Sequence, residues 1–345
     1  MQVSTIGLDL AKNVFQVHGI DVEGNAVMRK TLRRAHVLPF FAALPPSLIG
    51  IEACSSANYW ARELMKLGHT VKLMPPSYVK PYVKRGKTDA ADAEAICEAV
   101  RRPTMRFVAV KSPDQQAVLM LHRVRALLMR QRTMATNALR GHLAEFGIVA
   151  GQGTKNLRDL IERVFTTDAD QSELPRLARI ALEPLVMQLN DLQMRIRVID
   201  VELLAWHRTS EASQRLETIP GVGFITATAI AATVTDPTHF KSSRQFAAWL
   251  GLTPKQHSSG GKERLGGISK MGDTYLRTLL VVGATSVMRY ARDKGAVSAV
   301  WINRLLAKKP ARLVSVALAN KTARIAWALL VRQEDYRAPT MPAAA

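Results

Sequence analysis

The stretch IGLDLAKNVFQVHGI, residues 6–20, decides the fold of the first part of the chain. Residues 3–10 are apolar enough to predict a buried strand that is closed by an acid, Asp9. Residues 14–20 predict a second strand, the DVEGN segment predicts a turn, and residues 26–32 can return as a third strand. The succession predicts a three-stranded meander with an acidic residue at the end of its first strand.

Strands and helices alternate after the meander. SLIGIEA (47–53) and TVKLM (70–74) predict short strands, and ANYWARELMKLGH (57–69) between them predicts an amphipathic helix. KTDAADAEAICEAVRR (87–102) predicts a further helix, for which Thr88 can serve as the N-cap. Residues 1–110 are therefore predicted to form an α/β domain.

The rest of the chain is predicted to be mainly helical. Residues 111–210 contain two long amphipathic patterns with GQGTKN (151–156) as the turn between them, which fits coiled-coil arms for oligomerisation or an ordinary helical bundle. Residues 211–333 are helical except for a glycine-rich segment, residues 253–272. The tail, residues 334–345, is expected to be disordered.

The charge of the chain favours a polyanionic partner over a basic enzyme of another kind. The 345 residues include 48 Lys and Arg against 28 Asp and Glu, a net charge of +20; from residue 241 onward the count is 18 against 5. Nucleic acid is the commonest partner of such a chain. With only Cys54 and Cys97, no run of ~20 apolar residues and no signal-peptide pattern in MQVSTIGLDLAKN, we expect no membrane segment and a reducing cytoplasm.

Four acids are candidates for a metal site. Asp9 and Glu52 close two predicted strands, and Asp89 and Asp92 share one face of the later helix. Like charges brought together in this way repel unless a cation lies between them, and Mg²⁺ or Mn²⁺ prefers oxygen ligands. The alternative is a set of solvated surface acids, one of them a partner of the helix dipole.

Two basic or glycine-rich segments are candidates for phosphate binding. In LETIPGVGFITATAIAATV, Gly221 and Gly223 lie in a turn that resembles a helix–hairpin–helix, although a plain helical turn is the alternative. The glycine-rich segment carries Lys255, His257, Ser258, Ser259, Lys262, Arg264 and Lys270. From its residues alone, it is more typical of a flexible phosphate-binding loop than of a catalytic serine.

Several motifs together resemble one transposase family. IGLDLAKNVFQVHGID, IGIEACSSANYWAR and TDAADAEAI look like the RuvC-like, RNase H-type domain of the DEDD transposases of the IS-one-ten and IS-eleven-eleven insertion sequences. The patterns G-L-x-P-x-x-x-x-S-G and I-S-K-x-G-x-x-x-L-R look like the transposase domain of the same family. The resemblance covers nearly the whole chain.

The resemblance implies specific roles for these residues. Asp9, Glu52, Asp89 and Asp92 would be the DEDD metal ligands, and Ser259 would be the nucleophile, with Ser258 or Ser269 as alternatives. Members of the family are recombinases guided by a bridge RNA, a structured non-coding RNA that pairs with donor and target DNA. The resemblance also implies a site composed of residues from two subunits, a tetramer of two dimers, and action at the bacterial nucleoid.

Two rival functions stay open. A RuvC-like metal nuclease or junction resolvase would hydrolyse DNA with water and use Ser259 only to bind phosphate. A non-catalytic nucleic-acid-binding protein would need none of the four acids. The order of the acids along the chain favours the enzymes over the binding protein.

Overall fold

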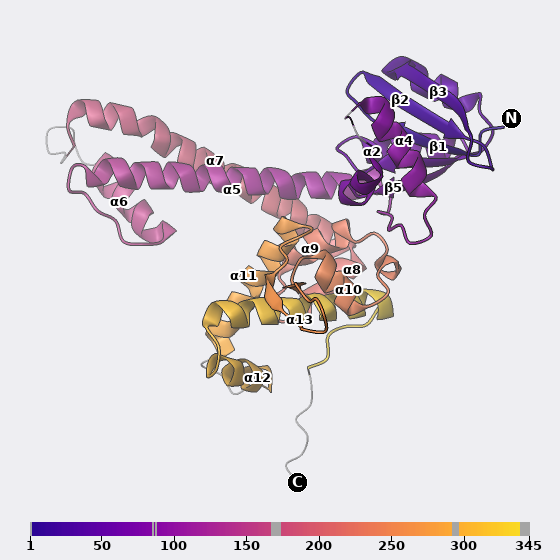
Figure 1. The fold of residues 1–345 in the computed structure, drawn as a ribbon. Helices are drawn as coiled ribbons and strands as arrows, with labels where there is room; N and C mark the ends of the chain where they lie inside the picture. Colours follow the sequence, from indigo (N-terminus) through magenta and orange to yellow (C-terminus); the bar gives the residue numbers. More distant parts are fainter. Residues whose placement is uncertain (1, 85, 87, 167–173, 292–296, 339–345) are drawn as a thin grey trace, which may run out of the picture. The chain divides into compact units, whose positions relative to one another are not determined.

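Five strands form one mixed sheet in the order β3-β2-β1-β4-β5 (Figure 1). β2 pairs antiparallel with both β1 and β3, which confirms the predicted meander, and β4 pairs parallel with β1 and β5. The strand bounds are β1 Thr5–Asp9, β2 Val14–Ile20, β3 Ala26–Arg33, β4 Leu48–Glu52 and β5 Thr70–Met74. Parallel pairing places the carboxyl ends of β1 and β4 at one edge of the sheet.

The chain divides into two units, residues 1–113 and 114–345. The computed structural model describes residues 2–84, 86, 88–166, 174–291 and 297–338. The first unit contains the sheet and four helices: α1 Val37–Ala42, α2 Ala57–Lys66, α3 Pro76–Val79 and α4 Asp89–Val100. An α/β first unit is the architecture that the sequence predicts.

Side chains alternate across the sheet, so each face packs against different helices. Ile6 and Leu8 of β1 are fully buried in a core that includes Phe41 of α1 and Leu64 of α2. Helix α4 lies on the face that Gly7 presents, and it contacts β1, β2 and β4. The sheet is therefore covered on both faces, and α4 has one face to itself.

Glycine lets α4 lie directly on β1. A Cβ atom at Gly7 would lie 2.1 Å from the Ala93 carbonyl oxygen and 2.5 Å from the Cys97 nitrogen. One at Gly50 on the neighbouring strand would lie 2.8 Å from Val100 Cβ. These distances are far below a normal van der Waals contact, so only a strand without side chains at these two positions can hold the helix so close.

We expect Gly7→Ala to lower the stability of the first unit by about 1–3 kcal/mol, because the new methyl group meets backbone atoms that cannot move aside. Denaturant unfolding of the full chain, followed by the fluorescence of its tryptophans, measures this. Gly141→Ala in α5 is the matched control, since nothing lies within 4 Å of a Cβ there. That control should gain about 0.5–1 kcal/mol from helix propensity; equal effects of the two substitutions would contradict the close packing.

The second unit begins with two long helices, α5 Pro113–Ala144 and α7 Arg176–Thr209. They form an antiparallel pair: an early residue of α5, Val118, shares an apolar cluster with late residues of α7, Ile199 and Leu203. Leu139 and Leu143 share another with Leu182 and Leu189. The Arg125–Asp200 ion pair, 2.5 Å from Nε to Oδ1, lies beside the first of these clusters.

The prediction of a single turn between the long helices is incomplete. A further amphipathic helix, α6 Thr154–Thr166, follows the predicted turn (Figure 1). Its apolar residues Leu157, Leu160 and Val164 complete the core at the end of the pair. In the sequence this short apolar pattern lies directly after the GQGTKN segment, and the prediction treats that segment alone as the link between the two long helices.

The remaining helices form the second core of this unit. They are α8 Glu211–Glu217, α9 Phe224–Thr233, α10 Ser243–Trp249, α11 Thr274–Ala291, α12 Val297–Leu306 and α13 Ala311–Arg332. Strands β6 Pro254–Gln256 and β7 Leu265–Ile268 form a hairpin between α10 and α11. Of the predicted tail, the Tyr336 N–H donates to Thr218 Oγ1 at 2.9 Å, whereas residues 339–345 lie outside the described part.

Helix α13 is apolar as well as long. Within the described ranges, it is the helix whose length and composition would suffice to cross a membrane. Ala319, Ala323 and Ala326 on one of its faces are fully buried in the core that it shares with α10 and α11. Because it also carries Lys321 and Arg324, we interpret α13 as a core helix.

Candidate metal centre and serine hairpin

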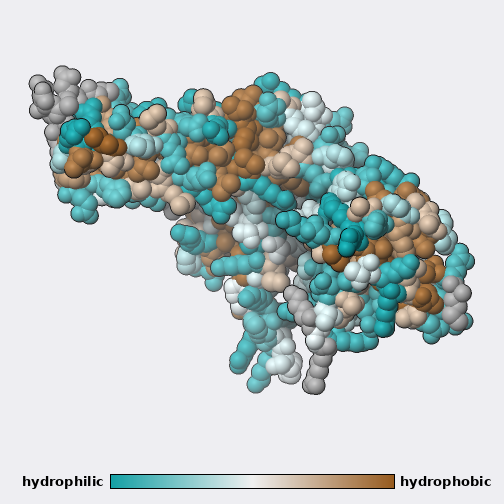
Figure 2. Space-filling view, turned by 90° about the horizontal axis from the view of Figure 1, so that it is seen from above, coloured by the Kyte–Doolittle hydropathy of each residue, from teal (hydrophilic) through white to brown (hydrophobic). Residues whose placement is uncertain are grey.

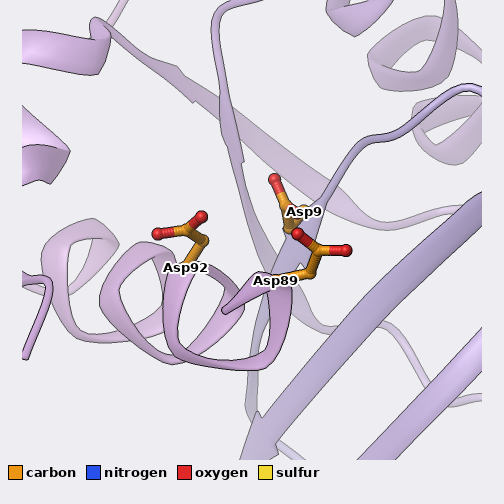
Figure 3. A group of neighbouring side chains, drawn as sticks. All are labelled: Asp9, Asp89 and Asp92. Carbon is orange, nitrogen blue, oxygen red and sulfur yellow. The ribbon is translucent and has the colours of Figure 1, made fainter. Parts of the chain in front are cut away.

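Three aspartates converge at the edge of the sheet. One carboxylate oxygen from each lies within 4.8 Å of those from the other two, with Asp9 at the end of β1 and Asp89 and Asp92 in the first turn of α4. Figure 3 shows the side chains of Asp89 and Asp92 rising from the helix on the side where Asp9 ends its strand. Thr88 caps the helix as predicted, accepting the Ala91 N–H at 3.2 Å.

Glu52 belongs to the surroundings of this group but not to the three. It ends β4, next to β1 in the sheet, and its negative charge acts on Asp9. Its carboxylate is not among the oxygens within 4.8 Å of one another. The structure thus brings three of the four predicted acids together and leaves the fourth beside them.

The electrostatics of Asp9 reflect this crowding. Burial is the largest cause that raises the pKa of the Asp9 carboxyl from 3.8 to about 6, and the negative charges of Asp92, Asp89 and Glu52 contribute to the same shift. The N–H of Leu10 opposes the shift by donating to the carboxylate. A charged group held in such surroundings is destabilised until a cation or a proton joins it.

The donor set fits a hard divalent cation. All three groups offer carboxylate oxygens, and the other acids of α4 are engaged elsewhere: Glu94 pairs with Lys84 at 2.5 Å and Glu98 pairs with Arg102. Mg²⁺ and Mn²⁺ take such ligands, usually keeping several waters. Asp9, Asp89 and Asp92, with Glu52 nearby, are therefore the residues that would hold the metal.

The glycine-rich segment forms a hairpin where we expected a flexible loop. Ser259 and Lys262 pair across its tip, with the Lys262 N–H donating to the Ser259 carbonyl at 3.1 Å. Gly260 and Gly261 between them have φ of +56° and +76°, as a two-residue type I′ turn requires. The Ser-Gly-Gly-Lys sequence carries the signal for this turn, so the hairpin could have been predicted.

The three candidate serines differ in how their hydroxyls are used. The Ser258 hydroxyl accepts the Arg264 N–H at 3.2 Å, and the Ser269 hydroxyl accepts the Met271 N–H at 3.4 Å. Ser259 is exposed, and its hydroxyl has no hydrogen-bond partner in the part of the chain that the structure describes. The hydroxyls of Ser258 and Ser269 therefore help to hold the hairpin together. The Ser259 hydroxyl makes no such hydrogen bond within the described residues.

A buried arginine holds the base of the hairpin, and the sequence analysis gave it no role. Arg277 of α11 donates from Nη1 to the Leu250 and Met271 carbonyls, at 2.9 and 3.1 Å. Gly251 and Gly272 interlock beside it, since a Cβ at either position would lie within 2.1 Å of a backbone oxygen. Arg277 is the final residue of the I-S-K-x-G-x-x-x-L-R pattern, so the motif itself was the signal.

Two family models match this chain. One, described as a transposase and of the DEDD type, matches residues 6–148; the other, described as Transposase IS116/IS110/IS902 family, matches residues 213–297. A probable family 20 transposase of Pseudomonas aeruginosa is 52% identical over 98% of this chain and 99% of its own length. The chain belongs to the IS110 family of insertion-sequence transposases.

More distant relatives carry the same description. The transposase for insertion sequence element IS1328 of Yersinia enterocolitica is 43% identical over 94% of this chain and 96% of its own length. The transposase for IS1111A of Coxiella burnetii is 40% identical over 97% and 92%. Membership makes the chain a DNA-recombining enzyme, and the DEDD match covers the unit that carries the aspartates and continues through α5.

The two turn glycines of the transposase differ in their surroundings. Gly221, with φ of +84°, packs against α11, where a Cβ would lie 2.6 Å from Val287 Cγ2. Nothing lies within 4 Å of a Cβ at Gly223, which precedes α9. The structure therefore gives Gly221 a packing role and leaves the backbone at Gly223 accessible.

The predicted phosphate-binding cations of the transposase lie around the hairpin. Lys255, His257, Lys262, Arg264 and Lys270 are all exposed. Lys270 has φ of +54°, in the left-handed region that favours glycine, and its N–H donates to the Gly251 carbonyl at 3.1 Å. The exposure of all five cations allows contact with a polyanion, and their role in binding stays a prediction.

We expect the raised pKa of Asp9 to give the metal-free transposase a definite pH dependence. The folded state binds a proton to Asp9 below about pH 6, whereas the unfolded state does so only below about pH 3.9. Stability should therefore rise as the pH falls through 6 and lose this contribution above it. In EDTA at pH 7.5, Asp9→Asn should raise Tm by roughly 2–4 °C, and the gain should shrink at pH 5.

Glu98→Gln on the same helix is the control, because Glu98 forms an exposed ion pair with Arg102 and such pairs contribute little. Differential scanning fluorimetry at the two pH values makes the measurement. A loss of stability in Asp9→Asn at pH 7.5 would show that the carboxylates do not repel as described. Added Mg²⁺ should stabilise the parent chain and not Asp9→Asn.

Proposed function

We propose that this transposase is a bridge-RNA-guided DNA recombinase that joins donor and target DNA through a covalent phosphoserine at Ser259. The observation that carries the proposal is the exposed Ser259 hydroxyl at the tip of a hairpin, in a chain whose other unit gathers three aspartates. These are the residues to which the family resemblance assigns the nucleophile and the metal ligands. Donor and target duplexes are the proposed substrates.

The serine step conserves the energy of the phosphodiester bond in a phosphoserine ester. The Ser259 Oγ–phosphorus bond forms, and the bond from that phosphorus to the neighbouring sugar oxygen breaks. The hydroxyl releases its proton, and the departing sugar oxygen takes one up. Attack by the sugar oxygen of another strand reverses the step and frees the serine, so strands are exchanged without an external energy source.

The proposed role of the aspartates is to hold a metal ion that acts on the phosphate. Asp9, Asp89 and Asp92, with Glu52 beside them, would hold Mg²⁺ or Mn²⁺, which would supply Lewis-acid stabilisation of charge on phosphate oxygens. Because Asp9 is partly buried beside other negative charges, binding of a cation at this site would be favourable even before DNA binds. We propose that this site and Ser259 come from two different subunits.

If a guide RNA selects the site by base pairing, the protein itself need not recognise the DNA sequence. Base pairing selects the site in such systems, and the protein grips backbones. The exposed cations around the hairpin, Lys255, His257, Lys262, Arg264 and Lys270, suit that task, as does the Gly223 backbone before α9 within a proposed helix–hairpin–helix. Such a protein would work in the bacterial cytoplasm at the nucleoid.

The long helices carry an apolar surface suited to oligomerisation. On α7, Ile180, Met187, Met194 and Val201 recur every seven residues and are 51–69% exposed, away from the buried residues that face α5. Met120, Leu127 and Met134 repeat this spacing on α5. Figure 2 shows hydrophobic side chains gathered along this arm. A seam with this period is typical of coiled-coil partners, so we propose that the arms pair subunits into dimers that assemble as a tetramer.

We expect Met187→Glu with Met194→Glu to dissociate the oligomer while leaving the monomer folded, because the two new charges would be buried only in the assembly. Sedimentation velocity measures the molecular mass, and circular dichroism checks the fold. Ala181→Glu with Gln188→Glu adds the same charge at exposed positions of α7 outside the seam. Equal dissociation by both pairs, or by neither, would exclude the seam as the interface.

A strand-transfer assay with DNA, the element's RNA and Mg²⁺ tests the central proposal. The parent chain should give a protein-linked DNA end that disappears from a denaturing gel after protease treatment. Ser259→Ala should abolish that species, by more than ~100-fold, because the attacking atom is gone. Ser258→Ala and Ser269→Ala should retain it at a reduced level, since these serines only support the hairpin.

The rival functions give different results in the same assay. A metal nuclease leaves free hydrolysed ends that persist in Ser259→Ala. A non-catalytic binding protein gives no product, and Asp89→Asn leaves its binding to DNA unchanged. Linkage that follows Ser258 in place of Ser259 would reassign the nucleophile.

A further inference from the structure

An open groove runs along α13 next to the base of the serine hairpin. Its volume is about 760 Å³, within the range of about 300–1,000 Å³ of small-ligand sites. Pro254 and Ile268, which pair at the base of the hairpin, form part of its wall. The rest of the wall comes from Ser243 of α10, from Leu252 after that helix, from Trp301 of α12, and from a stripe of α13 that includes Leu313, Asn320, Lys321 and Arg324.

The helix that forms the floor of the groove is held firmly in place. The opposite face of α13 contributes Ala319, Ala323 and Ala326 to the core. On the groove side, the Asn320 amide donates to the Leu252 carbonyl at 3.1 Å, which ties α13 to the chain just before the hairpin. The groove is therefore tied to the segment that leads into the serine hairpin.

The groove has apolar walls and a purely cationic rim. Its described lining includes Lys321 and Arg324 and contains no acid. Residues 297–333 as a whole contain seven Lys and Arg and no Asp or Glu. Neither Lys321 nor Arg324 forms an ion pair with a carboxylate within the described ranges. The site thus offers two uncompensated charges beside an apolar surface.

An aromatic ring lies beside these charges. The Lys321 ammonium lies 4.7 Å from the centroid of the Trp301 ring, a cation–π distance that holds it at the wall of the groove. Proteins that bind single strands combine an aromatic surface for a base with cations for the backbone. Trp301, Lys321 and Arg324 supply both parts.

We propose that this groove binds one unstacked nucleotide, with its base against Trp301 and the apolar wall and its phosphate on Lys321 and Arg324. The proposal rests on the proposed function in one respect, namely that a strand is held at the adjacent hairpin. The charge decides the occupant: a protein segment of ordinary composition would leave the two cations without partners, whereas every nucleotide brings an anion with it. DNA and RNA strands offer the same chemistry here.

Photocrosslinking identifies the occupant directly. A thymine oligonucleotide with one 5-iodouracil, and its ribose counterpart with 5-iodouridine, are irradiated with the full chain, and the crosslinked peptide is found by mass spectrometry. We expect attachment at Trp301, and the stronger of the two arms shows whether DNA or RNA is preferred. Crosslinks confined to other aromatic residues would overturn the proposal.

Binding of the same oligonucleotides measures the contribution of each part. Trp301→Ala should weaken binding about 5- to 150-fold, the range for loss of one base–aromatic stack, and Trp301→Phe should restore most of it. Arg324→Gln should lower the slope of log K against log salt by about 0.7. Arg332→Gln is the matched control, an exposed arginine on the same helix outside the groove.

Equal effects of Arg324→Gln and Arg332→Gln would show a diffuse charge effect and overturn the site. A change of oligomeric state in Leu313→Arg with unchanged oligonucleotide binding would assign the groove to a second copy of the chain instead. These assays need no metal and no strand transfer. They can therefore fail while Ser259 chemistry succeeds, or succeed while it fails.

Discussion

The contact between β1 and α4 at Gly7 is the constraint on which the metal centre depends. Asp9 follows Gly7 by two residues along the strand. On the helix, Asp92 directly precedes the touching residue Ala93, and Asp89 lies about one turn before it. The missing side chain lets the two backbones meet, so three carboxylates from distant parts of the sequence converge. The burial of Asp9 and the repulsion among the carboxylates are the cost of this arrangement, and together they raise the pKa of Asp9.

Glycine serves the second unit in a different way. At Gly260 and Gly261 it permits the two left-handed residues of a tight turn, and at Gly251 and Gly272 it permits two backbone segments to interlock below. Arg277 satisfies the carbonyls exposed by this interlocking. The result is a hairpin that presents one serine hydroxyl while the neighbouring serines hold its backbone.

Each unit contributes a different kind of charged group. The aspartates that suit a cation lie in the first unit, and the exposed cations that suit a phosphate backbone lie around the hairpin and groove of the second. Phosphoryl transfer needs both kinds of group at one phosphate. The apolar seam of the long helices offers a physical reason for these units to act in an assembly of subunits.

The sequence alone determined the meander, the alternating strands and helices, the Thr88 cap and the four acids as candidates, because strand period, helix period and capping are local properties of the chain. It also contained the signal for the Gly260-Gly261 turn, although we interpreted that segment as a loop. That three acids meet while Glu52 stays beside them depends on the tertiary structure. So does the finding that, among the described residues, Ser259 is the one of the three candidate serines whose hydroxyl has no hydrogen-bond partner. The tertiary structure also decided that α13 forms a groove with Trp301. These features depend on which backbones can approach each other, a property of contacts between residues far apart in the sequence.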